Sequence, residues 1–333
     1  MGRSLAELAL AVSERSKRWP IACWYWGDAI LVDGLLAVDD AGIAPARDHV
    51  VTLLGRWLDT VPPDYHDVLA PGAAISRLVS EGALPGIALE RFLAAVDRLP
   101  PLFDDTPVLE PHLPRLRFGV CIDAVYHLPS ALAAAGIQIG DGLLTRRAIR
   151  MAGQTMERLR CRGGFAQWYD VAQDRNNGVP WSRGVGWALL GLLDTLSLVD
   201  VASDAADLSA LATEILQDLE ATQRPDGNWG PVLGRPDLEV ETSVAAFFLA
   251  AAHHPQAAGI ALAPDSLAAA EAAVRRAITS DGIYQGVSAD VLPEWDPSSY
   301  AKFAVEPSPW GQGAALRALA AVASAHHRRP PAT

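Results

Sequence analysis

Residues 181–196 read WSRGVGWALLGLLDTL, and this stretch is apolar on nearly every side of the helix that it predicts. A helix that is apolar around its whole circumference belongs inside a protein. Other segments share this character and open with Gly, Trp or a polar residue. They are residues 24–38, 70–79, 121–136, 241–252 and 309–323. Together with 181–196 they predict six inner helices.

A second kind of helix alternates with the inner ones and carries charged side chains along one face. The segments are 4–17, 46–60, 87–98, 142–160, 207–223 and 265–279. Because a charged stripe suits a solvated layer, we expect these helices to lie outside the inner ones. The inner helices also recur at a loosely regular spacing of roughly 45 to 70 residues, which is typical of a degenerate repeat. The sequence therefore predicts an all-α fold, an (α/α)6 toroid of six helical hairpins, as a single domain over residues 1–333.

Composition narrows the classes of protein to consider. The chain has 333 residues, of which 50% are hydrophobic, and a net charge of -12. This charge argues against nucleic acid or an anionic membrane as the main partner, because both require clustered Lys and Arg. The sequence contains no run of 18 apolar residues, so no membrane-spanning helix is predicted. Glu7 interrupts the apolar stretch at the N-terminus, which indicates an amphipathic helix and no signal peptide.

Cysteine usage and two loop segments complete the outline. Three cysteines give neither a disulfide framework nor a metal-binding pattern, and they fit a reducing, cytoplasmic location. The loop 99–119 is long and rich in proline, so we expect it to form part of the wall of a functional site. We expect the C-terminal segment 326–333 to be disordered.

Polar and aromatic residues gather at the starts of the inner helices. They are Trp24, Trp26, Asp28, Asp67, Asp123, Arg183, Trp187, Glu241, Thr242, Ser243, Trp310 and Gln312. If the inner helices run parallel, these positions meet at one mouth, where the helix N-termini favour an anionic ligand. Two interpretations stay open, because a polar residue at a helix start is often only a cap and a tryptophan often only fills the core. For Asp28 we favour the structural interpretation.

Asp123 is the strongest candidate for a catalytic residue. It lies in VCIDAVYHLP, residues 120–129, between apolar residues on a segment that is predicted to be buried. A carboxylate in such a place must be paired or must have a raised pKa. Both are properties of a general acid/base.

Arg183 and Trp187 stand four residues apart and therefore share one face of the predicted helix. A guanidinium beside an indole can hold a uronic acid, with charge against carboxylate and ring against ring. Gly184 and Gly186 leave space for a ligand to approach closely. The alternative is that Trp187 serves packing alone.

Several segments together resemble glycoside hydrolase families 88 and 105, the unsaturated glucuronyl and rhamnogalacturonyl hydrolases. WSRGVGW resembles the WGRGNGW helix of these families, and CIDAVYHLP and GGFAQWYD resemble two segments that precede it. ATQRPDGNWGPVL, ETSVAAFFLAAA and WGQGAALRAL resemble three segments that follow it. The matches keep the family's order and cover roughly residues 20–325.

The resemblance implies a reaction on sugars that carry a 4,5-double bond in a terminal uronic acid. In these families an Asp protonates C4 of the enol ether, water adds at C5, and the hemiketal opens and releases the aglycone. By resemblance, Asp123 is the general acid/base. Asp67 positions the water or maintains the protonation of Asp123. Arg183 and Trp187 contact the substrate, and His112 lies in the region of a family histidine.

The chain departs from the family pattern at three positions. Gln167 stands where the family usually has His, Val185 where it has Asn, and His127 where it has a methionine-like residue. Gln can bond a sugar hydroxyl but cannot take up a proton at neutral pH. We place Gln167 and His127 in the substrate-binding set. The other members are Arg183, Trp187, His112, Trp24, Trp26 and Trp310.

The expected partner is a small carbohydrate with a uronate group, bound by a monomer or a homodimer. We expect no metal and no organic cofactor, because hydration requires only acid/base groups and water. Three alternatives remain. In the first, the chain is another sugar enzyme with this toroidal fold, such as an epimerase that relies on His127. In the second, it is a family member that acts on a small unsaturated uronoside metabolite. In the third, it is a non-catalytic sugar-binding protein, which Gln167 and Val185 would favour.

Overall fold

The computed structural model describes residues 3–110, 113–199 and 205–328. His112 lies outside these ranges, so its role remains a prediction. No helix in the described ranges is long and apolar enough to cross a membrane.

The outer helices form where the charged stripes predict them. They are α1 (Leu5–Ser16), α3 (Arg47–Thr60), α5 (Ile87–Asp97), α8 (Gly142–Leu159), α10 (Ala206–Ala221) and α12 (Pro264–Ala277). Their starts carry local signals. Ser4 and Glu7 form a capping box at α1, and the Asp141 side chain accepts from the backbone of Leu143 and Leu144 at α8.

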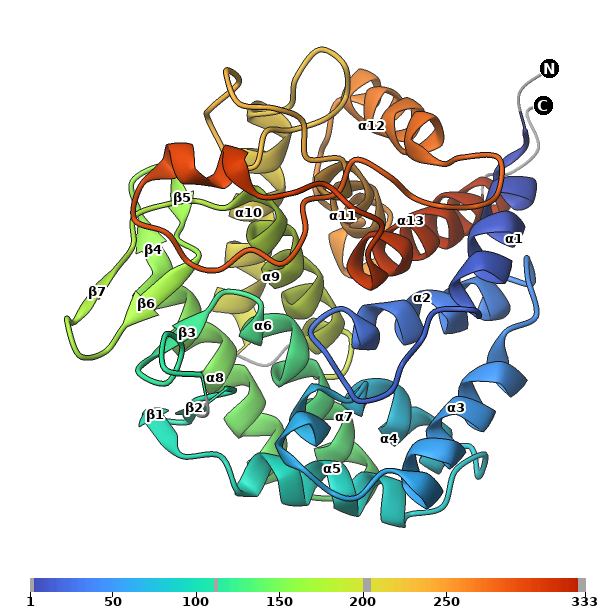
Figure 1. Ribbon diagram of the computed structural model, residues 1–333, viewed down its shortest axis with the longest axis vertical. Coiled ribbons are helices and arrows are strands. Elements are labelled where there is room, and N and C mark those ends of the chain that lie inside the picture. Colours follow the sequence, from blue (N-terminus) through green and yellow to red (C-terminus); the bar gives the residue numbers. More distant parts are fainter. Residues whose placement is uncertain (1–2, 111–112, 200–204, 329–333) are drawn as a thin grey trace.

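The inner helices form a closed ring. They are α2 (Asp28–Asp40), α4 (Gly72–Ser80), α6 (Ala124–His127) continued by α7 (Pro129–Ile139), α9 (Ser182–Leu196), α11 (Ser243–Ala252) and α13 (Pro309–Arg328). Each packs against the next, and α13 packs against α2 (Figure 1). Each outer helix also packs on the inner helix of its own hairpin. The predicted (α/α)6 toroid is confirmed.

Two inner helices differ from the predicted bounds. The segment 121–136 is not one helix, because α6 ends at His127 and α7 begins at Pro129. Pro129 has no N–H to donate, so the backbone hydrogen bond that would continue the helix through this residue is missing and the helix breaks there. The first inner helix begins at Asp28, so Trp24 and Trp26 lie in the loop that precedes it.

Short strands, which the sequence did not predict, connect the helices. They are β1 (Pro101–Phe103), β2 (Thr106–Pro107), β3 (Gly119–Cys121), β4 (Arg160–Cys161), β5 (Gly164–Phe165), β6 (Trp168–Asp170) and β7 (Arg175–Asn176). The strands β3, β6 and β7 form an antiparallel sheet in which Cys121 pairs with Trp168. The sheet therefore fixes the chain just before Asp123. Short 3-10 helices lie at Tyr65–Leu69 (η1), Pro255–Ala257 (η3) and Pro297–Lys302 (η4).

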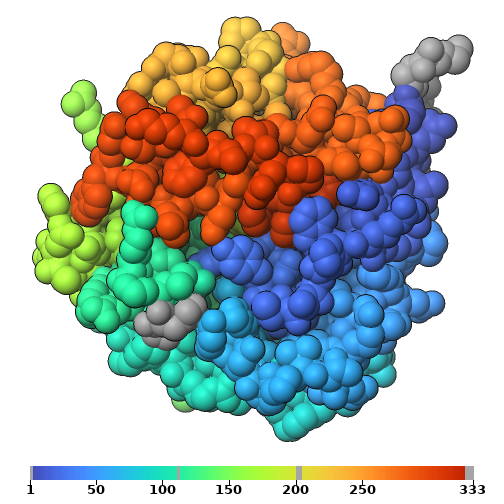
Figure 2. Space-filling view, in the orientation of Figure 1, coloured from blue at the N-terminus to red at the C-terminus, as the bar shows by residue number. Residues whose placement is uncertain are grey.

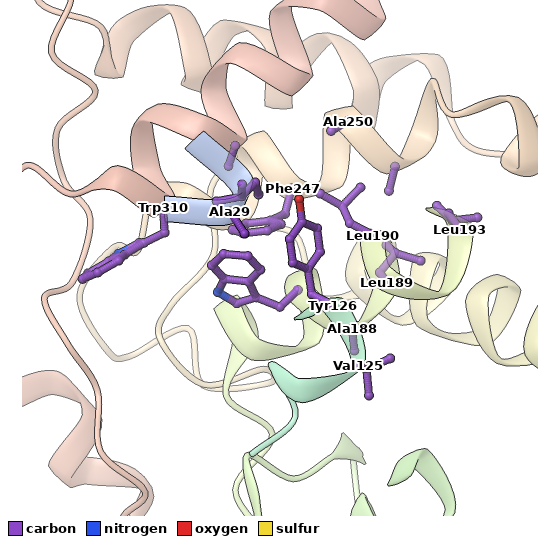
Figure 3. Packing of buried hydrophobic residues seen from close by; sticks show 14 of the residues in the cluster. Ala29, Val125, Tyr126, Ala188, Leu189, Leu190, Leu193, Phe247, Ala250 and Trp310 are labelled. Carbon is purple, nitrogen blue, oxygen red and sulfur yellow. The ribbon is translucent and has the colours of Figure 1, made fainter. Parts of the chain in front are cut away.

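Glycines allow the inner helices to approach one another closely. A β-carbon on Gly34 of α2 would lie 2.6 Å from the carbonyl oxygen of Gly313 in α13. One on Gly191 of α9 would lie 2.2 Å from the carbonyl oxygen of Val125 in α6. Around these contacts the core is aliphatic and aromatic, as Figure 3 shows for Tyr126, Leu190 and Phe247 among others.

The last inner helix runs to Arg328 and so enters the segment 326–333 that we expected to be disordered. Residues 329–333 lie outside the described ranges. The helix also packs against α1, which brings the first and last helices of the chain together (Figure 1).

Candidate active site

A pocket lies at the end of the toroid where the inner helices begin, and it encloses about 530 Å³ together with its mouth. Most of this space is the open mouth, because the inner part that can hold water-sized groups measures only about 50 Å³. On this face the first, middle and last parts of the chain meet (Figure 2). Five residues of the predicted site line the pocket, namely Trp26, Asp123, Arg183, Trp187 and Trp310. Residues that the sequence analysis did not select also line it, among them Tyr25, Glu110, Cys121, Asp290 and Val291.

Asp123 occupies the N-cap position of α6, directly after β3. Its Oδ1 atom is buried and has no hydrogen-bond partner within the described part of the chain. Burial raises its pKa to about 7, the charges of Asp290 and Glu110 add to this rise, and Arg183 opposes it. At neutral pH Asp123 is therefore protonated in a large fraction of molecules and can act as a general acid.

Arg183, in the first turn of α9, lies between the pocket and a segment that crosses the mouth. We call this segment, residues 288–293, the strap. The guanidinium donates to the Ser288 carbonyl, to Ser288 Oγ at 3.0 Å and to the Ala289 carbonyl at 2.8 Å. It also lies over the rings of Trp181 and Trp310, at 4.8 and 5.1 Å from their centroids. Arg183 thus places a positive charge beside Asp123 while it anchors the strap.

Glu241 is a structural partner of Arg183. Its Oε2 lies 3.5 Å from Arg183 Nη1 and accepts from the backbone N–H of Ser288 at 2.9 Å. Its Oε1 accepts from the backbone and the hydroxyl of Ser243 at the start of α11, at 3.1 and 2.7 Å. Glu241 therefore caps a helix and also holds the first residue of the strap. Asp28 accepts from the backbone of Tyr25 at 2.8 Å, in line with the structural interpretation.

Gln167 lies behind the strap and does not line the pocket. Its Nε2 donates to the Val291 carbonyl at 2.8 Å, and its Oε1 accepts from the Tyr300 hydroxyl. The prediction that Gln167 binds the substrate is thus corrected, because both ends of its amide are engaged within the protein. Asp290, the neighbour of Val291, accepts from the Tyr25 hydroxyl at 2.5 Å, and the Trp310 indole donates to the Ser288 carbonyl at 3.2 Å.

Trp187 lies at the base of the pocket in an aromatic cluster. Its ring centroid is 4.8 Å from that of Tyr126 and 5.1 Å from that of Phe247. Offset and edge-on pairs of this kind hold rings in fixed orientations. The two interpretations of Trp187 are compatible, since it is buried in the core and also lines the pocket.

His127 and Trp24 were expected to bind the substrate, but neither lines the pocket. His127 is buried behind Trp26 and Trp187, with ring centroids at 5.0 and 5.6 Å. Burial lowers its pKa to about 3, so the imidazole is neutral near pH 7. Trp24 is also buried and packs edge-on against Trp57 at 5.7 Å. Both residues belong to the core.

Asp67 does not line the pocket either, because it is held in a buried ion pair. Arg91 donates from Nε to Oδ2 at 2.8 Å and from Nη2 to Oδ1 at 3.0 Å. The Trp57 indole donates to Oδ1 at 2.9 Å, and the backbone N–H of Asp64 donates to Oδ2 at 3.2 Å. Both carboxylate oxygens are thus satisfied within the protein. The expected role of Asp67 beside Asp123 is corrected to that of a structural residue that joins η1 to α5.

Glu110 is the main residue of the pocket that the sequence analysis missed. It lies in the loop 99–119, which was expected to form a wall of the site and does so. Burial raises its pKa to about 7, a hydrogen bond from Trp26 opposes the rise, and the charge of Asp290 adds to it. The signal was present in the sequence, because Glu110 follows the apolar residues Val108 and Leu109 and precedes Pro111. The described residues contain no group of three or more His, Cys, Asp or Glu side chains arranged for a metal ion.

Comparison with known proteins bears on the family that the sequence resembles. Residues 163–325 match the model of Glycosyl Hydrolase Family 88. The resemblance to this family is confirmed. A curated relative is the unsaturated rhamnogalacturonyl hydrolase YesR of Bacillus subtilis (strain 168), which is 28% identical over 160 residues. This match spans 47% of the chain and 45% of YesR, less than half the length of the relative.

Solved structures share the fold over nearly the whole chain. A possible member of the GH105 family from Klebsiella pneumoniae subsp. pneumoniae MGH 78578 has a TM-score of 0.82 at 17% identity, over 98% of this chain and 94% of that one. The unsaturated glucuronyl hydrolase of Bacillus sp. GL1 has a TM-score of 0.64 at 17% identity, over 95% and 93% of the two chains. The glycosyl hydrolase family 88 protein of Bacteroides vulgatus has a TM-score of 0.72 at 16% identity, over 96% and 98%.

Proposed function

We propose that this protein is a glycoside hydrolase that hydrates the enol ether of a 4,5-unsaturated uronyl sugar and so releases the aglycone. One observation carries the proposal. Asp123 lies at the pocket with a buried, unpartnered carboxyl oxygen and a pKa raised to about 7, beside the positive charge of Arg183. The match to Glycosyl Hydrolase Family 88 and the activity in the name of the relative YesR support the same reaction class.

The pocket suits each requirement of this chemistry. A protonated Asp123 donates to C4, which leaves positive charge at C5 and on the ring oxygen, and water then adds at C5. The charge of Arg183 and the N-terminus of α9 favour the substrate carboxylate on that side of the pocket. The rings of Trp26, Trp187 and Trp310 line the pocket and offer apolar surfaces for a sugar ring.

Spectroscopy with an unsaturated uronyl disaccharide tests the proposal. Hydration removes the double bond, so turnover by the wild type lowers the ultraviolet absorbance of the enol ether. We expect Asp123→Asn to be folded and inactive, because an amide cannot donate a proton of comparable acidity. Turnover by Asp123→Asn at the wild-type rate would exclude Asp123 as the acid. A wild type that leaves a panel of such disaccharides unchanged would reject the reaction itself.

The alternative enzymes and the non-catalytic interpretation lose their main support. An epimerase that relies on His127 would need that imidazole in the pocket, whereas it lies behind Trp26 and Trp187. Gln167 lies behind the strap and Val185 is buried in α9, so neither departure from the family pattern removes a group from the pocket. A small unsaturated uronoside remains a candidate substrate, and the disaccharide panel can be extended to it.

The remaining features of the proposal follow from the sequence. We propose one catalytic domain over residues 1–333, a small uronate-bearing carbohydrate as the partner, and a monomer or homodimer in the cytoplasm. The free thiols of Cys23, Cys121 and Cys161 support a reducing compartment. Light scattering of the purified protein and fractionation of its host cells test the oligomeric state and the location.

A further inference from the structure

Glu110 faces the same pocket as Asp123 and is the more deeply buried of the two. Only 6% of its surface is exposed, and its Oε2 atom has no hydrogen-bond partner within the described part of the chain. A buried polar atom without a hydrogen-bond partner lowers the stability of the fold, and such atoms are found where a water or a ligand supplies the missing hydrogen bond. Glu110 therefore has an open acceptor inside the pocket.

Asp67 offers a direct contrast. Its two oxygens accept from Arg91, Trp57 and the backbone of Asp64, and the residue does not line the pocket. Each oxygen accepts two hydrogen bonds within the protein, so neither is open to a water molecule. Of the two carboxyl groups, only Glu110 can contact a water molecule next to a sugar bound in this pocket.

We propose that Glu110 is a catalytic residue that accepts the proton of the water molecule that attacks C5, whereas by resemblance Asp123 is the general acid/base and Asp67 positions the water or maintains the protonation of Asp123. This inference rests on the proposed function. In the first step the π electrons of the C4–C5 bond take the proton of Asp123, a C4–H bond forms, and Asp123 becomes a carboxylate. In the second step the water oxygen bonds to C5 and one water proton passes to the Glu110 carboxylate. Proton exchange with solvent then resets both groups for the next turnover.

The surroundings of Glu110 suit this division of roles. The titratable and charged groups near it are Asp123, Asp290, Cys121, Tyr25 and Arg183. Burial raises the pKa values of both Glu110 and Asp123 to about 7. Carboxyl groups that interact in one pocket lose their protons in two steps, so near neutral pH one holds a proton while the other is ionised. One acid and one base are thus present together.

The indole of Trp26 favours the ionised form of Glu110. Its hydrogen bond lowers the pKa of that carboxyl, while the charge of Arg183 lowers the pKa of Asp123. A donor that bonds to a carboxylate favours the ionised form. Trp26 thus supports Glu110 as the base, and the variants below distinguish the roles of the two carboxyl groups.

The test compares Glu110→Gln, Asp67→Asn, Asp123→Asn and the matched control Glu306→Gln on the unsaturated disaccharide across the pH range. Glu306 is an exposed glutamate outside the pocket. We expect Glu110→Gln to lower kcat by about 100- to 10,000-fold, the usual contribution of general base catalysis. The pH profile of kcat for this variant should also lose its acidic limb, because that limb reports protonation of the base. The control should behave as wild type.

Chemical rescue distinguishes a base from a residue that only holds the pocket in shape. Added formate should restore part of the kcat of Glu110→Ala, since a small carboxylate can fill the space and accept the water proton. It should not restore Asp123→Ala to the same extent. A Glu110→Gln variant within threefold of wild type, with both limbs of the pH profile intact, would overturn the inference and leave the proposed function standing. A wild type without turnover would reject both.

Discussion

The side-chain nitrogen of Gln167 donates a hydrogen bond of 2.8 Å to the carbonyl oxygen of Val291. Gln167 follows β5 and Val291 belongs to the strap, so this bond joins the small sheets to the segment that crosses the mouth of the pocket. Since Oε1 of the same amide accepts from Tyr300, the side chain is fixed at both ends. The residue at the position where the resemblance suggests a histidine thus positions the strap.

The variant Gln167→Ala tests this role. Loss of two buried hydrogen bonds should destabilise the fold by about 1–3 kcal/mol and loosen the strap. We expect KM to rise more than kcat falls, because the strap shapes the binding pocket but carries no acid or base in the proposed first step. Thermal denaturation and steady-state kinetics measure both effects, with the exposed Gln256→Ala as a control. An equal loss of kcat and kcat/KM at unchanged KM would instead indicate a direct chemical role.

Asp67→Ala should reduce stability far more than it alters the chemistry of the folded enzyme. The change leaves the Arg91 guanidinium buried without its carboxylate partner, and breaking such a pair typically costs about 3–5 kcal/mol. Chemical denaturation should show a lower free energy of unfolding, and Arg91→Ala should show a similar loss. A fully stable Asp67→Asn protein without activity would contradict the structural role and return Asp67 to the mechanism.

The stability of the protein should depend on pH through Asp123. Its folded-state pKa, raised to about 7 from 3.8, means that the folded protein binds this proton more tightly than the unfolded chain. The resulting stabilisation is complete below pH 3.8 and is lost as the pH rises through about 7. Asp123→Asn, which carries no charge at any pH, should therefore unfold at a higher temperature than wild type at pH 8. At pH 8 the free energies of unfolding of the two proteins should differ by a value on the order of 2–4 kcal/mol, and this difference should shrink as the pH falls from 7 to 4.

Calorimetry of both proteins at several pH values measures this difference. Glu110 titrates in the same range, so the comparison should be repeated in a Glu110→Gln background. Equal melting temperatures at pH 8 would contradict a raised pKa for Asp123.

Gly191→Ala tests the packing that places Asp123. A β-carbon at this position would lie 2.2 Å from the carbonyl oxygen of Val125, which is backbone and cannot move without shifting α6. We expect a loss of stability of about 1–3 kcal/mol, together with reduced activity. Gly55→Ala in α3, where a β-carbon has nothing within 4 Å, should be neutral or slightly stabilising. Unfolding curves for the two variants make the comparison.

Most of the fold could be predicted, because the composition of each helix indicates whether it is buried or solvated. Segments such as 181–196 and 241–252 are apolar all round, and they lie in the inner ring as expected. The break between His127 and Pro129 was visible as a proline but was outweighed by the length of the apolar segment 121–136. The strands could not be predicted, because two or three residues are too few to show alternation.

The site was only partly predictable, and the reason is tertiary contact. Asp123, Arg183 and Trp187 have local signals, namely a carboxylate among apolar residues and a spacing of one helical turn. Asp67 has a similar local signal, but its partner Arg91 lies on another helix, and nothing near Asp67 in the sequence indicates the ion pair. Gln167 was misplaced for the same reason, since its partner Val291 is far away in the chain.

The split of the third inner helix has a consequence for how the protein can tolerate insertions. Because α6 is a single turn, two contacts of the preceding strand set the direction of the Asp123 carboxyl. They are the pairing of Cys121 with Trp168 and the hydrogen bond of 2.9 Å from the Ile122 amide to the Gln167 carbonyl. Successive side chains of a strand point to opposite sides, so a slip of one residue in this pairing would turn the acid away from the sugar. An insertion in the hairpin before Trp168, whose residues do not line the pocket, would then abolish the proposed activity while the ring of helices stayed intact.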